Sequence, residues 1–484
     1  MMCRIMRKNE DAYLTVYLSL MLPLLLSFFF TFLYGAKKSA MKMQIECVAD
    51  IGLNAVLSEY NRELFSQYDL LFVDMSYGGQ KPSIHNTTAR LRHYLLKNLN
   101  GFEDVWGSRE FLNTSLEEAE ILQYSLATDD GGEVMKRQIV DYYEHTAEGI
   151  LNDLLPEAKG LDADFWDADV SEERENNQRD IDSIDLPEIE TETGEMEEVE
   201  LGNPADVANR TRNGGILGLV LPDTGNISCR QVEVGQLASH RSLAKGDGLS
   251  EEAKAVSGSC SELLFHRYLF DKLGFYGQEL EKGALAYQIE YLIAGKDSDW
   301  DNLEAVCNRI LLGREAVNVA YIFTDSGKVA EAEAWAAGLT AVILTPELLE
   351  PVKISLLLAW AYVESLQDLR ILLEGGKVPV QKTEATWHTS LEDILHIKSS
   401  LRSINNPSGL EYKEYLSGLL FTVSDNTKTF RTMDVMEMDI RRTEGNHFFR
   451  MDGCTDCILA KMSTSNGLGI EVNLERRYGY YYSR

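Results

Sequence analysis

The sequence lacks the short motifs that mark the commonest catalytic sites. It contains no H-E-x-x-H metal-binding pattern, no G-x-S-x-G nucleophile elbow and no complete phosphate-binding loop, since Gly327-Lys328 has no first glycine at the required spacing. Histidine, a frequent general base and metal ligand, occurs only 8 times in 484 residues. We therefore predict a protein that is not an enzyme and that has no catalytic, cofactor-binding or metal site.

Positive charge is also scarce. The chain has 46 Lys and Arg against 77 Asp and Glu, a net charge of -31, whereas nucleic-acid binding needs a basic surface. Residues 157–200 alone hold 18 acidic and three basic residues, with few aromatics. Such a segment cannot bury enough apolar surface to offset its ordering entropy. We predict a disordered acidic linker over 156–201 rather than a Ca²⁺-binding tract, whose D-x-D-x-D-G spacing is absent.

Long apolar runs are absent with one exception. Residues 12–34, AYLTVYLSLMLPLLLSFFFTFLY, carry no charge and follow a short basic leader at 1–11. A helix of this length extends about 34 Å, and the hydrocarbon core of a bilayer is about 30 Å thick. We predict that 1–11 is cytoplasmic and that 12–34 spans the cell membrane once. Pro23 removes one backbone donor, and we expect a kink there.

A cleaved signal peptide is the alternative to a retained anchor. Its apolar core is normally about 7–15 residues long, and it ends at a small-x-small site. The run here is longer, and the small residues Gly35-Ala36 have Tyr34 or Leu33 three positions before the cut. We favour the retained anchor. Lysines and arginines are equal in number on the two sides, so charge does not fix the orientation. We predict that the C-terminal part lies outside the cytoplasm, from its size and from the family resemblance given below.

Residues 35–155 are predicted to form a membrane-proximal helical region. Apolar residues at three- or four-residue steps predict that the membrane helix continues as an amphipathic helix, with one stripe formed by Met41, Ile45, Ala49, Leu53, Val56, Tyr60 and Leu64. The stripe requires a partner. A second copy, another protein, or helices of this chain from the Arg90–Leu99 and Leu116–Leu126 regions could each supply one.

Residues 202–484 are predicted to form a mixed α+β domain that is mainly helical. Ser298 can cap a helix that carries Leu303, Val306 and Cys307 on one face. Further helices are expected at Ala330–Leu344, before Pro346, and at Leu356–Leu373, before Gly375-Gly376. Asn446–Lys461 and Leu468–Tyr481 alternate in polarity around a turn signal at Ser463–Gly467, which predicts a terminal β-hairpin.

The most specific chemical signal comes from cysteine, which occurs 7 times in the chain. Cys454-Thr-Asp-Cys457 is a C-x-x-C motif in the expected hairpin, without the βαβ context of a redox motif or a second pair for zinc. An exported location favours a structural disulfide between these two residues. Cys307, on an apolar helix face, is expected to be a buried thiol.

Other groups of possible ligands have simpler interpretations. His388, Glu392 and His396 would share one face of a helix, but no fourth ligand can be named, and a polar face is favoured. The pairs His145–Glu148 and Glu444–His447 are interpreted as solvated surface. We interpret Asp297, Asp299 and Asp301 as acids at a helix start. The aromatic and basic segment at 476–482 is expected to be an edge strand rather than a docking patch.

Two stretches resemble proteins of tight-adherence pilus systems. Thr15–Leu26, TVYLSLMLPLLL, resembles the start of TadE/TadG-like proteins, with Pro23 at their central proline. The family's glutamate and preceding glycine are replaced here by Tyr17 and by Asp11-Ala12, so the resemblance implies an anchor that stays in the membrane rather than a subunit that is cut and polymerised.

The sequence is similar over a wider range to an uncharacterised group encoded among tight-adherence pilus genes of Gram-positive bacteria. The resemblance covers Glu46–Gly78 and resumes in 286–322, 356–382, 409–420 and 431–440. It implies a non-catalytic, membrane-anchored, minor pilin-like accessory component, whose N-terminal helix contacts other pilus or secretion proteins. A membrane-anchored extracellular enzyme and an adhesive or sensing module at the cell wall are the alternatives.

Overall fold

The structure is a computed structural model in which two compact units are distinguished. It describes residues 3–480 except 101–111, 147–160, 162, 168, 185–187, 191–195, 199–204, 213–214, 250–258 and 344. The first unit combines residues 1–138, 243–255 and 443–484, and the second combines 139–242 and 256–442. The terminal segment 443–484, predicted as part of a C-terminal domain, thus groups with the N-terminal part of the chain.

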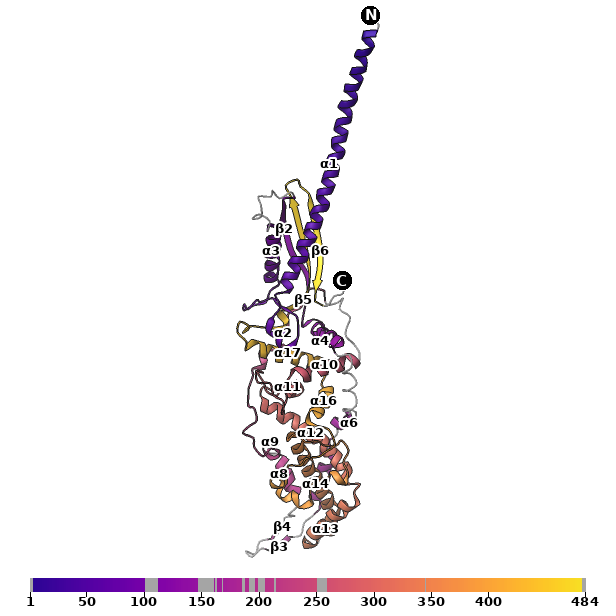
Figure 1. Cartoon of the computed structure of the whole chain (residues 1–484). Coiled ribbons are helices and arrows are strands. Elements are labelled where there is room, and N and C mark those ends of the chain that lie inside the picture. The colour runs from indigo at the N-terminus through magenta and orange to yellow at the C-terminus, as the bar shows by residue number, and fades with distance from the viewer. Residues whose placement is uncertain are drawn as a thin grey trace. The chain divides into compact units, whose positions relative to one another are not determined.

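The first unit is built around a long helix and an antiparallel sheet (Figure 1). Its elements are α1 (Cys3–Leu57), α2 (Arg62–Tyr68), β1 (Val73–Asp74), α3 (Ile84–Asn100), β2 (Thr114–Leu126), β5 (Cys454–Asn466) and β6 (Glu471–Gly479). Strand β5 is central: β2 pairs along one edge, and β6 and the two residues of β1 pair along the other. The register places Ile121 opposite Ala460 and Met462 opposite Leu474.

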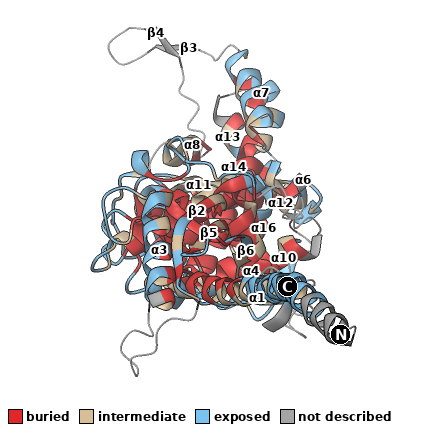
Figure 2. Cartoon of the chain, turned by 90° about the horizontal axis from the view of Figure 1, so that it is seen from above, coloured by how far each residue is buried: buried red, intermediate tan, exposed pale blue. Residues whose placement is uncertain are grey.

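The second unit is helical apart from the short pair β3 (Glu188–Glu190) and β4 (Met196–Glu198). Its helices are α6 (Ala163–Asp167), α7 (Ser171–Asp182), α8 (Ala205–Arg212), α9 (Leu217–Val220), α10 (Ser259–Lys272), α11 (Gln288–Ala294), α12 (Asp299–Ile322), α13 (Ser326–Ile343), α14 (Leu349–Leu373), α15 (Ile397–Ser400), α16 (Tyr412–Thr422) and α17 (Asp425–Arg441). A further helix, α4 (Glu133–Thr146), spans the boundary between the units in sequence. Helix α14 packs against α12 and α13 and is buried over most of its length (Figure 2).

The buried helix α14 carries charged residues in the interior of the second unit. The side chain of Lys382 lies 2.6 Å from Glu364 and 2.6 Å from Asp368 on α14. Arg314 on α12 completes the cluster at 3.0 Å from Asp368, and all four side chains are fully buried. Two cations balance two anions, which is the condition under which buried charges are tolerated.

The prediction of a mainly helical protein with a small antiparallel sheet and a terminal hairpin is confirmed. Ser298 caps α12 by accepting a hydrogen bond from Asp301 N at 3.1 Å, as expected. The predicted helices before Pro346 and before Gly375 are α13 and α14. The hairpin strands differ from the predicted ranges in their bounds. Residues 446–453 precede β5, and residues 463–466, predicted as part of the turn, belong to it.

Two predictions of local structure are wrong in part. Leu116–Leu126, expected as a helix, lies in strand β2, because its pairing with β5 outweighs the helix propensity of its Glu and Ala residues. Part of the predicted disordered linker forms α7, which packs on α14 and buries Ile181 and Asn177. Asn177 Nδ2 donates to Pro351 O at 3.1 Å. Residues 156–160, 162, 168, 185–187, 191–195 and 199–201 of that linker lie outside the described residues.

Candidate functional site

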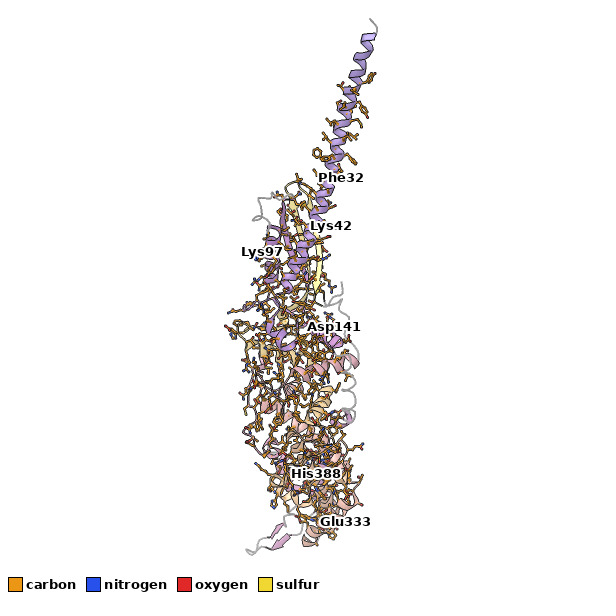
Figure 3. All side chains as sticks on the ribbon, in the orientation of Figure 1. Phe32, Lys42, Lys97, Asp141, Glu333 and His388 are labelled. Carbon is orange, nitrogen blue, oxygen red and sulfur yellow. The ribbon has the colours of Figure 1, made fainter. Side chains whose placement is uncertain are left out.

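The first half of α1 presents large apolar side chains to its surroundings. Exposed fractions reach 77% at Tyr13, 72% at Phe28 and 73% at Phe32, whereas side chains of this kind are normally buried. Figure 3 shows this part of the helix extending beyond the sheet of the first unit, with Phe32 labelled. Over the described residues, one helix is long and apolar enough to cross a membrane, and it is this one, over Tyr13–Leu57.

Pro23 lies inside the exposed half, and α1 continues through it as one helix. Its ring leaves the carbonyl of Ser19 without the usual helical donor. The hydroxyl of Ser19 donates to the carbonyl of Val16 at 2.8 Å. The structure thus places Pro23 where the sequence predicts it, and the kink stays a prediction.

The second half of α1 is buried on one side. Met41, Ile45, Ala49, Leu53 and Val56 have no exposed surface, which confirms these members of the predicted stripe. They form one cluster with residues of α3 and of the sheet, among them Leu91, Leu95, Ile121, Ile458 and Met462. The partner of the stripe is therefore within this chain. The Arg90–Leu99 helix covers it as expected, and strands cover the remainder.

Gly52 allows the close approach of α1 and α3. A Cβ atom built at this position would lie 2.9 Å from Leu95 Cδ2, closer than such carbons normally come. The other glycine of α1, Gly35, has no heavy atom within 4 Å of the same construction. Both glycines interrupt the same helix in the sequence, but only Gly52 is required for packing against a neighbouring helix.

Polar contacts fix strand β6 along α1. Arg476 forms an ion pair with Asp50 through two hydrogen bonds of 3.0 and 3.1 Å. The hydroxyl of Tyr478 donates to Asn54 Oδ1, and that of Tyr480 donates to the carbonyl of Leu57. Four helical residues rise about 6 Å and two strand residues about 6.6 Å, so Asp50 and Asn54 match Arg476 and Tyr478. We call this set of contacts the α1–β6 latch.

The latch also decides the interpretation of the aromatic segment at 476–482. Tyr478 and Tyr480 are partly buried in or just after the strand, and β6 lies at the edge of the sheet. The edge-strand interpretation is therefore confirmed for residues 476–480. Residues 481 and 482 lie outside the described part.

Titratable groups surround the end of α1 and the sheet. The hydroxyl of Tyr94 on α3 donates to Glu59 Oε1 at 2.6 Å, and this hydrogen bond raises the pKa of Tyr94. Asp456 lies at a bulge of β5 and is fully buried, which raises the pKa of its carboxyl. A hydrogen bond from Ser125 and the positive charge of Arg137, 3.6 Å away, oppose that rise.

Cys454 and Cys457 are both buried at the start of β5, on either side of the Asp456 bulge. The thiol of Cys454 donates to the carbonyl of Arg450 at 3.3 Å. Three residues of extended strand span about 10 Å between Cα atoms, and a disulfide joins Cα atoms less than about 7 Å apart. A bridge would require the bulge to bring the two closer, and the pairing stays a prediction. Cys307 is buried in α12, as predicted, and burial raises the pKa of its thiol.

The other candidate ligands do not gather into a site. His388 precedes a 3-10 helix, Leu391–His396, that holds the other two residues, so Glu392 and His396 do not share an α-helical face with it. Asp299 is buried at the start of α12 and accepts hydrogen bonds from Ala286 N and Tyr287 N. Within the described ranges no group of three His, Cys, Asp or Glu residues could hold a metal ion. Glu148 lies outside those ranges.

Comparison with known proteins places most of the folded chain in a family. A model of a family of unknown function, DUF5702, matches residues 194–466, more than half of the chain. The chain belongs to the DUF5702 family. The DUF5702 match includes helices α8 to α17 and the whole of β5, and it begins well after α1. No curated protein and no solved structure matches the chain.

Sequence reasoning missed the α1–β6 latch. The residues of the latch are of types that are common on protein surfaces. The paired residues are more than 400 positions apart, and the separation of Asp50 and Arg476 is 426. The tyrosines at every second position were the available signal in the sequence, because two strand residues extend about as far as four helical residues.

Proposed function

We propose that this protein is a non-catalytic, membrane-anchored accessory component of a tight-adherence-type pilus or secretion apparatus. The observation that carries the proposal is the division of α1 into an exposed apolar half and a half packed into a folded unit. The first half would cross the cell membrane once, and the rest of the protein would lie outside the cytoplasm.

The packing of α1 supports a role in placement and assembly. The helix is continuous from Cys3 to Leu57, so a force or a contact on its apolar half acts directly on the sheet. Helices at the membrane boundary that continue into a packed core leave little freedom between anchor and domain. Resemblance of Thr15–Leu26 and Glu46–Gly78 to pilus-associated proteins supplies the biological setting, with other pilus proteins as the partners of the exposed half.

Removal of the gene in the organism that encodes it tests the proposal. We expect fewer surface filaments by electron microscopy and weaker adherence, both restored by the wild-type gene. A gene that carries Leu25→Arg and Phe29→Arg should restore neither filaments nor adherence, because the two substitutions place charge in the apolar half of α1.

The matched control is Phe448→Arg, which adds the same charge at a residue that is 50% exposed outside α1. This variant should restore filaments and adherence as the wild type does. Filament number and adherence that are unchanged by the deletion would exclude the proposed role.

A further inference from the structure

The second unit contains a cavity of about 230 Å³ that has one polar and one apolar wall. Helix α7 supplies Ser171, Arg174, Glu175, Asn177 and Gln178 to the polar wall, and α8 contributes Arg212. The mainly apolar wall comes from α8 and α14, with Ala205, Ala208, Leu358 and Ala359 beside the single hydroxyl of Ser355. This division is typical of small-molecule sites, in which a few polar groups orient a mainly apolar ligand.

The charge of Arg212 is already balanced. Its Nη1 donates to Glu315 Oε2 at 2.9 Å, and its Nη2 donates to the other oxygen of that buried carboxylate. The guanidinium also lies 3.9 Å from the centre of the Tyr362 ring. These contacts hold Arg212 in place but do not involve its Nε. This atom is buried and has no hydrogen-bond partner among the described residues.

The charge of Arg174 is not balanced in the same way. Its Nη2 donates to Ser171 Oγ at 2.9 Å, and the Ser171 hydroxyl in turn donates to Asp169. The Nε of Arg174 is buried without a partner in the described part of the chain. Burial and the neighbouring charge of Arg212 lower the pKa of Arg174, although Glu315 and Asp169 offset part of this effect. A partly buried cation in this state favours an anion beside it.

We propose that this cavity binds a small monocarboxylate with a short aliphatic body. The carboxylate would accept from Arg174 and from Nε of Arg212, and the aliphatic part would contact Ala208 and Leu358. Glu175 also lines the cavity, but it is exposed to solvent, whereas Arg174 is partly buried and has no bidentate counter-ion among the described residues, which calls for a single negative charge beside it. A phosphate dianion would leave an excess of negative charge next to Glu315, and a neutral amide would not compensate Arg174.

Equilibrium dialysis of the full chain in nanodiscs against radiolabelled butyrate tests this site. We expect saturable binding that unlabelled butyrate displaces and that butyramide and inorganic phosphate do not. Arg174→Gln removes the charge and should weaken binding about tenfold or more, the effect of one charge-assisted hydrogen bond. Arg179→Gln on the exposed side of α7 is the matched control and should leave binding unchanged.

A second variant keeps the test valid if Arg174→Gln does not fold. Ala208→Val fills the cavity from its apolar wall without altering either arginine, and it should weaken butyrate binding while phosphate stays without effect. The absence of saturable butyrate binding would overturn the proposal. Equal displacement by butyramide, or full binding by a folded Arg174→Gln protein, would overturn it as well.

Discussion

The two halves of α1 have the same secondary structure, but they differ in apolar content and in the distribution of apolar side chains around the helix. From Tyr13 to Tyr34 apolar side chains lie on every side and nearly all are exposed. From Met41 to Leu57 most of them lie on one side, which is buried against α3 and the sheet, while Met43 and Ile51 are exposed. The first pattern is complementary to lipid and the second to a protein core.

The environment of a helix depends on where its apolar side chains lie and not only on how many it has. A helix that packs on one side must keep its other side polar, as Lys42, Glu46 and Asp50 do here. Exposed apolar residues on all sides leave no surface suited to water. Five experiments test this difference between the two halves.

The largest effect is expected from a charge in the buried half. Leu53→Asp places a carboxylate in a fully buried position and should destabilise the first unit by about 4 kcal/mol or more. The neighbouring Ile51→Asp, at a position that is 50% exposed, should cost less than about 1 kcal/mol. Thermal unfolding in detergent measures both. Equal losses would show that the stripe is not the packed face.

A charge in the exposed half should act on the membrane and not on the fold. Leu25→Arg should oppose membrane insertion by about 2.5–3.5 kcal/mol, the cost of an arginine at the centre of a membrane helix. Ile51→Arg on the same helix is the control and should not change insertion. The measurement is the inserted fraction in a microsome assay. If both variants insert like the wild type, the apolar half is not a membrane span.

Of the two halves of α1, only the packed half lies in a unit whose buried carboxyl groups make stability depend on pH. Residues 12–34 contain no Asp, Glu, His, Lys or Arg, whereas burial raises the pKa of Asp456 from 3.8. A raised carboxyl pKa contributes stability that is complete below pH 3.8 and is lost as pH rises through the higher value in the folded protein. Asp456→Asn should remove the contribution of this group to the slope, up to about 1.4 kcal/mol per pH unit, from unfolding curves between acid and neutral pH. Membrane retention should not vary over that range.

The two glycines of α1 should respond to alanine with opposite signs. Gly35→Ala meets no atom and should stabilise the helix by about 1 kcal/mol. Gly52→Ala gains the same helix propensity but forces Leu95 to move, so overpacking of about 1–3 kcal/mol should give a net loss. Unfolding temperatures compare the pair. A stabilising Gly52→Ala would mean that α1 and α3 do not approach this closely.

The smallest effect is expected in the α1–β6 latch. The side chains of Arg476 and Asp50 are 45% and 41% exposed, so Arg476→Ala should cost only about 0.2–1 kcal/mol. The loss should shrink in 1 M salt, where the screening length is about 3 Å. Glu471→Ala, on the same strand and exposed, serves as control. A loss that is independent of salt would assign the effect to packing.

The sequence predicts those features of the fold that depend on local patterns. The stripe from Met41 to Val56, the cap at Ser298 and the buried helix α14 follow from period, capping chemistry and length. The sheet could not be predicted in the same way, because Ile121 and Ala460 pair across more than 300 positions and periodicity contains no information on partners. Helix α7 was missed because a few anchors, Ile181 and Asn177, offset a segment that is otherwise acidic.

The same limit applies to the candidate sites. The apolar run at 12–34 is visible in the sequence because a membrane span needs consecutive residues. The cavity next to Arg174 and Arg212 is not visible, since it depends on three helices meeting. Ionic partners such as Glu315 are distant in the sequence, and arginine is a residue type that is mostly exposed, so its position alone indicates no site.

The α1–β6 latch has a consequence for the order of events during biosynthesis. Arg476 follows Asp50 by 426 residues, and synthesis at about 5–20 residues per second separates their appearance by roughly 20–85 s. During that time the stripe from Met41 to Val56 has no β5 or β6 to cover it, although α3 is already present. The apolar cluster around α1 can therefore be completed only after translation has passed β6.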